Sequence, residues 1–179
     1  MQYYRTILVV EDDPNDQILI REAFNSIAVQ NGIQVVSSGS EAIAYLMGES
    51  EFADRTNYAY PTFITTDLKM ANGDGFSVLQ HLKANPEWAV IPVVVLTASN
   101  DPDDIVKAYL LGASCYHLKS ASQAELRHQL KILHDYWMTC MIPVVDETGR
   151  QVQTNSKGKL GERFKQPSGG MQTRAGSYD

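Results

Sequence analysis

The sequence has few of the features that mark secreted, membrane-spanning or nucleic-acid-binding proteins. Two cysteines among 179 residues are too few for a disulfide framework, and no apolar run approaches the length of a transmembrane helix. The first residues lack the layout of a secretory signal peptide. A formal net charge of −6 argues against the basic face that nucleic-acid binding needs. We therefore expect a cytoplasmic protein that binds neither membrane nor nucleic acid.

The apolar residues, 44% of the chain, alternate between two kinds of pattern along the sequence. Short apolar runs predict buried strands at residues 6–10, 33–36, 61–66, 91–97 and 115–118, and a helical pattern follows each one. Strands with little polar alternation are typical of a parallel sheet covered on both faces. We predict an α/β fold, a doubly wound five-stranded parallel sheet with flavodoxin-like (βα)5 topology.

The composition changes after the last predicted helix. Residues 146–179 are rich in Gly, Ser, Gln and Thr, and they hold six Lys or Arg against four Asp or Glu. Such a composition predicts a flexible polar tail. We expect one domain at residues 1–145 and a tail at 146–179, which leaves no room for a separate output domain.

Several reactive side chains follow the predicted strands at their carboxyl ends. Glu11 and Asp12 follow the first strand, Asp67 the third and Lys119 the fifth, while Thr97 ends the fourth. In a doubly wound sheet these ends meet at one edge. Clustered carboxylates repel unless a cation lies among them, and Mg²⁺ prefers oxygen ligands. A carboxylate can also accept a phosphoryl group. A metal ion and an ammonium would neutralise the charge on the phosphoryl oxygens, and a hydroxyl would donate a hydrogen bond to one of them.

Four segments of the chain, taken in order and with their spacing, resemble response-regulator receiver domains. They are the first-strand motif Ile7–Pro14, the phosphoacceptor loop Thr66–Met70 with Gly75, the fourth-strand motif Pro92–Ala98 and the fifth-strand motif Gly112–Lys119. Jointly these segments are highly specific, although each one alone would be weak.

The resemblance implies a phosphorylation site that depends on Mg²⁺. Asp67 matches the phosphoacceptor. Glu11 and Asp12 match the acidic pair that binds the metal together with Asp67 and the backbone carbonyl of Lys69. A sensor histidine kinase would be the phosphoryl donor.

The resemblance also implies how the signal leaves the site. Thr97 and Lys119 match the phosphate-sensing hydroxyl and lysine, and Tyr116 matches an aromatic residue that changes rotamer with Thr97. The fourth helix, fifth strand and fifth helix would then form the surface for a downstream partner or a homodimer. The protein would be a signalling adaptor that catalyses only its own phosphorylation and dephosphorylation.

Within the family, the chain looks most similar to single-domain regulators that partner bacterial phytochrome kinases. The features that carry this narrower resemblance are the long loop at 49–60, the Cys115–Ser120 run, and the aromatic pair Tyr136 and Trp137.

Three departures from the family pattern leave other functions open. Ser120 and Ala71 stand where receivers usually have proline, and Thr65 and Thr66 replace aliphatic residues before the acceptor. One alternative is a phosphorylation-independent interaction module on a receiver scaffold. A second alternative, which does not depend on these departures, is a metal-dependent phosphohydrolase that also uses an aspartyl phosphate, although such enzymes place their nucleophile in an Asp-x-Asp motif after the first strand.

Overall fold

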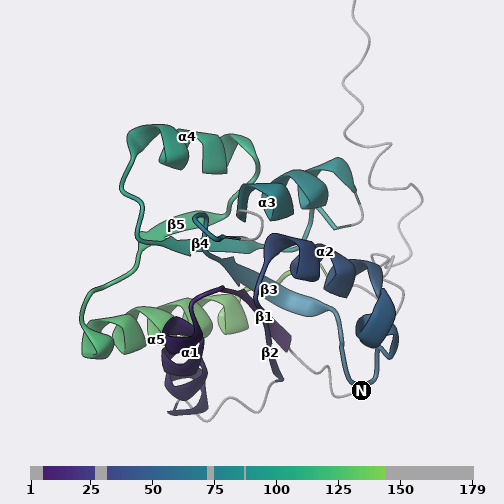
Figure 1. Cartoon of the computed structure of the whole chain (residues 1–179), viewed down its shortest axis with the longest axis horizontal. Coiled ribbons are helices and arrows are strands. Elements are labelled where there is room, and N and C mark those ends of the chain that lie inside the picture. Colours follow the sequence, from purple (N-terminus) through teal and green to yellow (C-terminus); the bar gives the residue numbers. More distant parts are fainter. Residues whose placement is uncertain (1–5, 27–31, 72–74, 87, 144–179) are drawn as a thin grey trace, which may run out of the picture.

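The computed structural model describes residues 6–26, 32–71, 75–86 and 88–143, and these form one parallel sheet with helices on both faces (Figure 1). The strand order is β2-β1-β3-β4-β5, so the direction of winding reverses between β1 and β3. This is the doubly wound, flavodoxin-like topology that the sequence predicts. The strands are β1 (Thr6–Val10), β2 (Ile33–Val36), β3 (Pro61–Thr66), β4 (Val93–Thr97) and β5 (Cys115–Leu118).

Two helices cover one face of the sheet and three cover the other, as Figure 1 shows. Alternate strand residues supply the two cores: Ile7 and Phe63 face α1 and α5, while Leu8 and Ile64 face α2, α3 and α4. A short 3₁₀ helix, η1 (Ser50–Ala53), lies in the long loop before β3. The helices are α1 (Pro14–Ser26), α2 (Gly39–Met47), α3 (Gly75–Ala84), α4 (Pro102–Leu110) and α5 (Gln123–Thr139).

The predicted strand boundaries agree with the structure except at the start of β4. The apolar run predicts a strand from Ile91, but the strand begins at Val93. The N–H of Ile91 donates to the carbonyl of Trp88 in a turn, at 2.9 Å, and Pro92 has no N–H to donate. The turn therefore delays entry into the sheet by two residues.

The cap of α1 fixes the chain as it leaves β1. The Asp13 carboxylate accepts the backbone N–H of Asn15 at 2.7 Å and that of Asp16 at 3.2 Å, and Pro14 occupies the first helical position. These hydrogen bonds lower the pKa of Asp13. The sequence Asp13-Pro14 predicts such a cap, with proline at the first helical position, and the structure confirms it.

Some predictions fall on residues that the structure does not describe. Gly32 predicts an end of the first helix near Asn31, which lies outside the described residues. The boundary after residue 145 and the tail at 146–179 lie outside them as well. Among the described helices, none combines the length and the apolar character that a membrane span requires.

Candidate functional site at the carboxyl edge of the sheet

The carboxyl ends of β1, β3, β4 and β5 bring Glu11, Asp67, Thr97 and Lys119 together at one edge of the sheet. Asp67 directly follows β3, and its backbone N–H donates to the carbonyl of Val10 at 3.0 Å. That bond holds Asp67 beside the end of β1. Asp67 is only 7% exposed, so its carboxylate lies in a sheltered position.

Both oxygens of the Asp67 carboxylate accept hydrogen bonds. Oδ1 accepts the hydroxyl of Thr97 at 2.6 Å and the backbone N–H of Lys69 at 3.0 Å. Oδ2 accepts the ammonium of Lys119 at 2.8 Å. The hydroxyl and the lysine that the sequence analysis assigns to phosphate sensing therefore contact the carboxylate assigned to accept the phosphoryl group.

The ammonium of Lys119 lies among three carboxylates. Its Nζ is 2.6 Å from Glu11, 2.7 Å from Asp16 and 2.8 Å from Asp67, so each of its three N–H groups can have one acceptor. Burial lowers the pKa of Lys119, but the hydrogen bonds to the carboxylates raise it further, and the net pKa lies above its usual value. Lys119 is therefore charged at neutral pH.

The acidic pair after β1 points in two directions. Glu11 is 2% exposed, and burial raises its pKa even though Lys119 partly offsets the shift. Oδ2 of Asp12 accepts the backbone N–H of Ala71, on the loop after β3, at 2.8 Å. Within the described part of the chain, no three Asp, Glu, His or Cys side chains are arranged to hold a metal ion. Glu11 and Asp67 both contact Lys119 instead.

The chemistry of these donors nevertheless fits a divalent cation. Carboxylates and a backbone carbonyl are hard oxygen ligands, the kind that Mg²⁺ and Mn²⁺ take. Glu11, Asp12 and Asp67 leave the ends of neighbouring strands β1 and β3. A metal bound here would compete with Lys119 for the oxygens of Glu11 and Asp67.

A second group of contacts links the acceptor loop to α4 and β5. The ammonium of Lys69 lies 2.7 Å from Oδ2 of Asp104 in the first turn of α4, and the hydroxyl of Ser99 donates to the same oxygen at 2.6 Å. The hydroxyl of Tyr116 donates to the backbone carbonyl of Ser99 at 2.8 Å. The predicted switch residue Tyr116 is thus connected through Ser99 and Asp104 to the loop that carries Asp67.

Side chains of α5 hold the loop after Lys119, where receivers usually have proline. The hydroxyl of Ser120 donates to Glu125, its backbone N–H donates to Gln129 at 3.3 Å, and Gln129 donates to the carbonyl of Leu118 at 2.9 Å. The peptide bond between Lys119 and Ser120 is trans, as expected for a bond that does not precede proline.

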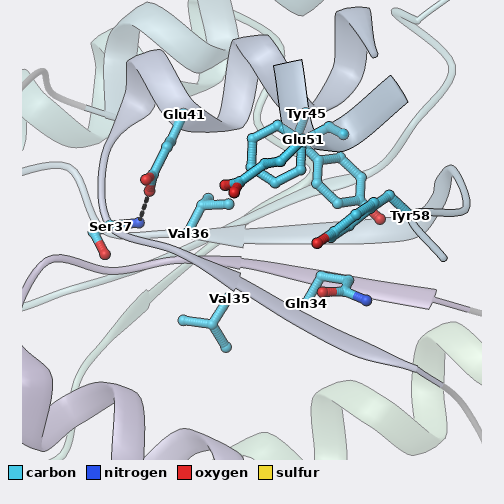
Figure 2. A pocket seen from close by; sticks show the side chains of 9 residues that line it. Gln34, Val35, Val36, Ser37, Glu41, Tyr45, Glu51 and Tyr58 are labelled. Carbon is cyan, nitrogen blue, oxygen red and sulfur yellow. Dashed lines mark hydrogen bonds between the residues drawn. The ribbon is translucent and has the colours of Figure 1, made fainter. Parts of the chain in front are cut away.

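A hollow beside the edge strand β2 is shown in Figure 2. Gln34, Tyr45 and Tyr58 are among the side chains that line it, and the carboxylate of Glu41 accepts the backbone N–H of Ser37 there at 2.5 Å. None of the predicted site residues lines this hollow. The candidate site is therefore the cluster around Asp67.

Comparison with known proteins decides the family. The model of the response regulator receiver domain matches residues 7–131. The chain belongs to this family. The receiver assignment, inferred above from four motifs, is therefore confirmed, and the phosphohydrolase alternative is set aside.

The similar proteins include phytochrome response regulators. Response regulator Rcp1 of Synechocystis sp. is 32% identical over 134 residues, which are 75% of this chain and 89% of Rcp1. The structure of the phosphorylated cyanobacterial phytochrome response regulator RcpA is 36% identical, with a TM-score of 0.74 over 79% of this chain and 100% of RcpA. The Mn²⁺-bound form of Rcp1 superposes with a TM-score of 0.71 at 32% identity, over 78% of this chain and 99% of that one. This receiver is thus related to phytochrome response regulators, as its sequence suggests.

The sequence did not single out three residues that the structure places around the site. Asp16 contacts Lys119, and Asp104 contacts both Ser99 and Lys69. The available signal for Asp16 was its place in the first turn after the α1 cap, beside the acidic pair. Asp104 looks in the sequence like an ordinary first-turn acid that favours the helix dipole, so nothing pointed to its partner.

Proposed function

We propose that this receiver accepts a phosphoryl group on Asp67 from a sensor histidine kinase of the phytochrome type, with Mg²⁺ as its metal. The observation that carries the proposal is the set of donors on one sheltered carboxylate: the Thr97 hydroxyl, the Lys69 N–H and the Lys119 ammonium. The relation to Rcp1 and RcpA supports the choice of kinase. The protein would act as a signalling adaptor in the cytoplasm, where kinases have access to ATP, and residues 1–145 would form its receiver domain.

In the proposed reaction, an oxygen of Asp67 attacks the phosphorus of a phosphohistidine. The oxygen–phosphorus bond forms as the phosphorus–nitrogen bond breaks, and the electron pair returns to the imidazole of the kinase. Thr97 and Lys119 would turn from the carboxylate to the phosphoryl oxygens, whose charge they neutralise. When bound, the metal would supply positive charge between the carboxylates and the phosphoryl group, held by Glu11, Asp12, Asp67 and the carbonyl of Lys69.

The phosphoryl group would then shift the equilibrium between two states of the receiver. It adds roughly 1.5 to 2 negative charges beside the Thr97 hydroxyl and the Lys119 ammonium, which donate to the Asp67 carboxylate in the unphosphorylated chain. Movement of Thr97 would displace Ser99, whose backbone N–H donates to the Thr97 hydroxyl, and so change the contact of Ser99 with the hydroxyl of Tyr116. Because the hydroxyl of Ser99 donates to Asp104 in the first turn of α4, this segment would be the route from Asp67 to the surface.

That surface carries exposed apolar side chains suited to a partner. On α4, β5 and α5 the exposed large residues include Val106, Tyr109, Leu110, Leu118 and Tyr136. Aromatic and aliphatic anchors of this kind are typical of interface cores. We propose this face as the contact surface for the downstream partner or for a homodimer.

The proposal is tested by incubating the protein with acetyl phosphate and Mg²⁺ and measuring its intact mass. The wild-type chain should gain one phosphoryl group, and Asp67→Asn should gain none. Asp135→Asn is the matched control, since Asp135 is an exposed carboxylate on α5. The proposal fails if the wild type gains no phosphoryl group with acetyl phosphate or with a cognate kinase. Partner binding that Asp67→Asn leaves unchanged would favour the interaction module instead.

A further inference from the structure

The first turn of α1 supplies a carboxylate to Lys119 in addition to those of Glu11 and Asp67. Oδ2 of Asp16 lies 2.7 Å from Nζ of Lys119, as close as the other two carboxylates. The side chain of Asp16 is 31% exposed and that of Lys119 only 12%. Asp16 therefore stands at the rim of the site and holds an ammonium that is largely shielded from water.

The α1 cap fixes the place of Asp16. Its backbone N–H donates to the carboxylate of Asp13 at 3.2 Å, in the turn that directly follows Glu11 and Asp12. The contact between Asp16 and Lys119 therefore joins the start of α1 to the end of β5, more than a hundred residues apart in the chain.

The three carboxylates that contact Lys119 have different roles in the proposed reaction. Asp67 would carry the phosphoryl group, and Glu11 would bind the metal, so both would exchange Lys119 for another ligand. Asp16 has neither task. Its contact with Lys119 can therefore persist while the other two contacts are given up.

We propose that Asp16 is a positioning residue for phosphoryl transfer, an anchor that keeps the ammonium of Lys119 aimed at the Asp67 carboxylate. This inference rests on the proposed function. A lysine carries its charge on a flexible four-carbon stem, so one fixed partner greatly narrows the directions in which the ammonium points. With one N–H held by Asp16, the remaining two are free to meet phosphoryl oxygens.

The loop after β5 makes such an anchor useful in this chain. Ser120 and Gln129 secure the backbone on either side of Lys119 through hydrogen bonds. Those bonds place the Cα of Lys119 and leave the far end of its side chain unrestrained. Asp16 acts on that far end directly, from the first turn of α1.

The test compares the wild type with Asp16→Asn, Asp16→Glu and Glu22→Gln. Glu22 is an exposed acid further along α1, so its change to Gln removes the same charge from the same helix. The first readout is the initial rate of phosphorylation over a range of acetyl phosphate concentrations at saturating Mg²⁺. The second is the ¹H–¹⁵N signal of the Lys119 ammonium, recorded without metal or phosphoryl donor. Thermal unfolding checks that every variant is folded.

We expect Asp16→Asn to lower the maximal rate roughly tenfold, within the range that misplacing a reacting group costs, and to broaden the ammonium signal through faster exchange with water. Asp16→Glu should recover part of both, and Glu22→Gln should match the wild type. An Asp16→Asn variant with the wild-type rate and signal would overturn the inference. Faster phosphorylation would also overturn it, because Asp16 would then compete with the phosphoryl group for Lys119.

The two proposals fail in different ways. If the wild-type chain takes up no phosphoryl group, the proposed phosphorylation of Asp67 is wrong. If Asp16→Asn nevertheless broadens the ammonium signal, Asp16 remains the anchor of Lys119. An ammonium signal that is the same in the wild type and Asp16→Asn would defeat the anchor, whatever the rate of phosphorylation.

Discussion

Replacing Gly75 with alanine should distort the loop that carries Asp67. Gly75 begins α3, and a Cβ at this position would lie 2.1 Å from the backbone carbonyl oxygen of Asp67 and 2.7 Å from the hydroxyl of Thr66. Carbon atoms in ordinary contact are about 3.5 to 4 Å from their neighbours. Because the first obstacle is backbone, it cannot rotate away as a flexible side chain would. The start of α3 or the acceptor loop must move by more than an ångström.

The size of the effect follows from this overlap. Adding atoms to a well-packed place costs about 1–3 kcal/mol, and a backbone obstacle belongs at the upper end of that range. Removing a glycine also restricts the unfolded chain, which offsets roughly 0.4–1 kcal/mol. The expected net loss is about 2 kcal/mol. For a domain of this size, that lowers Tm by roughly 6–10 °C.

Circular dichroism during heating measures this loss, with Gly32→Ala as the matched control. A Cβ on Gly32 would meet the hydroxyl of Thr6 at 3.6 Å, an ordinary contact, so this variant should melt close to the wild type. Phosphorylation of Gly75→Ala should also slow, because the backbone of Asp67 is displaced. A Tm for Gly75→Ala within about 1 °C of both other proteins would refute the reasoning.

Three further predictions concern other contacts of the domain. The hydrogen bond with Lys69 lowers the pKa of Asp104, so their pairing is complete above the usual carboxyl range and is lost as the pH falls through this lowered pKa. Lys69→Gln should therefore speed hydrogen exchange at the start of α4 relative to the wild type at pH 7, and this difference should shrink as the pH is lowered. A difference between variant and wild type that does not change with pH would contradict the pairing. Burial raises the pKa of Cys115 to about 11 and so lowers the fraction of the reactive thiolate. At pH 8 the alkylation of Cys115, followed by mass spectrometry, should be roughly 100-fold slower in the folded chain than in urea, and similar rates would disprove this. Arg55 donates to carbonyls of the last turn of α2, and its Cζ lies 4.1 Å from the ring centroid of Tyr60. Arg55→Ala should lower the free energy of unfolding, measured in urea, by about 1–3 kcal/mol, and an unchanged urea midpoint would count against this.

The sheet could be predicted from the sequence because each of its strands is a short apolar run between turn signals. Four of the five predicted strand ranges agree with the structure at both ends. The boundary at Val93 could not be predicted, because Ile91 is apolar and buried yet belongs to a turn. The 3₁₀ helix at Ser50–Ala53 was also missed, since only Phe52 packs inward and a single buried residue gives no period.

The centre of the site could be predicted because the residues follow strands whose carboxyl ends must meet. Asp67, Thr97 and Lys119 belong to that class, and the structure brings them into contact. Asp16 and Asp104 belong to helical first turns, where acidic residues are common for reasons of capping and dipole. The geometry of the loops decides which distant lysine Asp16 and Asp104 contact, and no local sequence pattern predicts these partners.

The most direct test of the account is to find which residue carries the phosphoryl group after transfer from a phytochrome-type histidine kinase. The transfer would be run with Mg²⁺, and the labelled chain digested at low temperature and mapped by mass spectrometry. The account predicts a phosphoryl group on the peptide that contains Asp67, absent when the metal is chelated and absent from Asp67→Asn. A phosphoryl group on another residue, or one that Asp67→Asn still acquires, would contradict it.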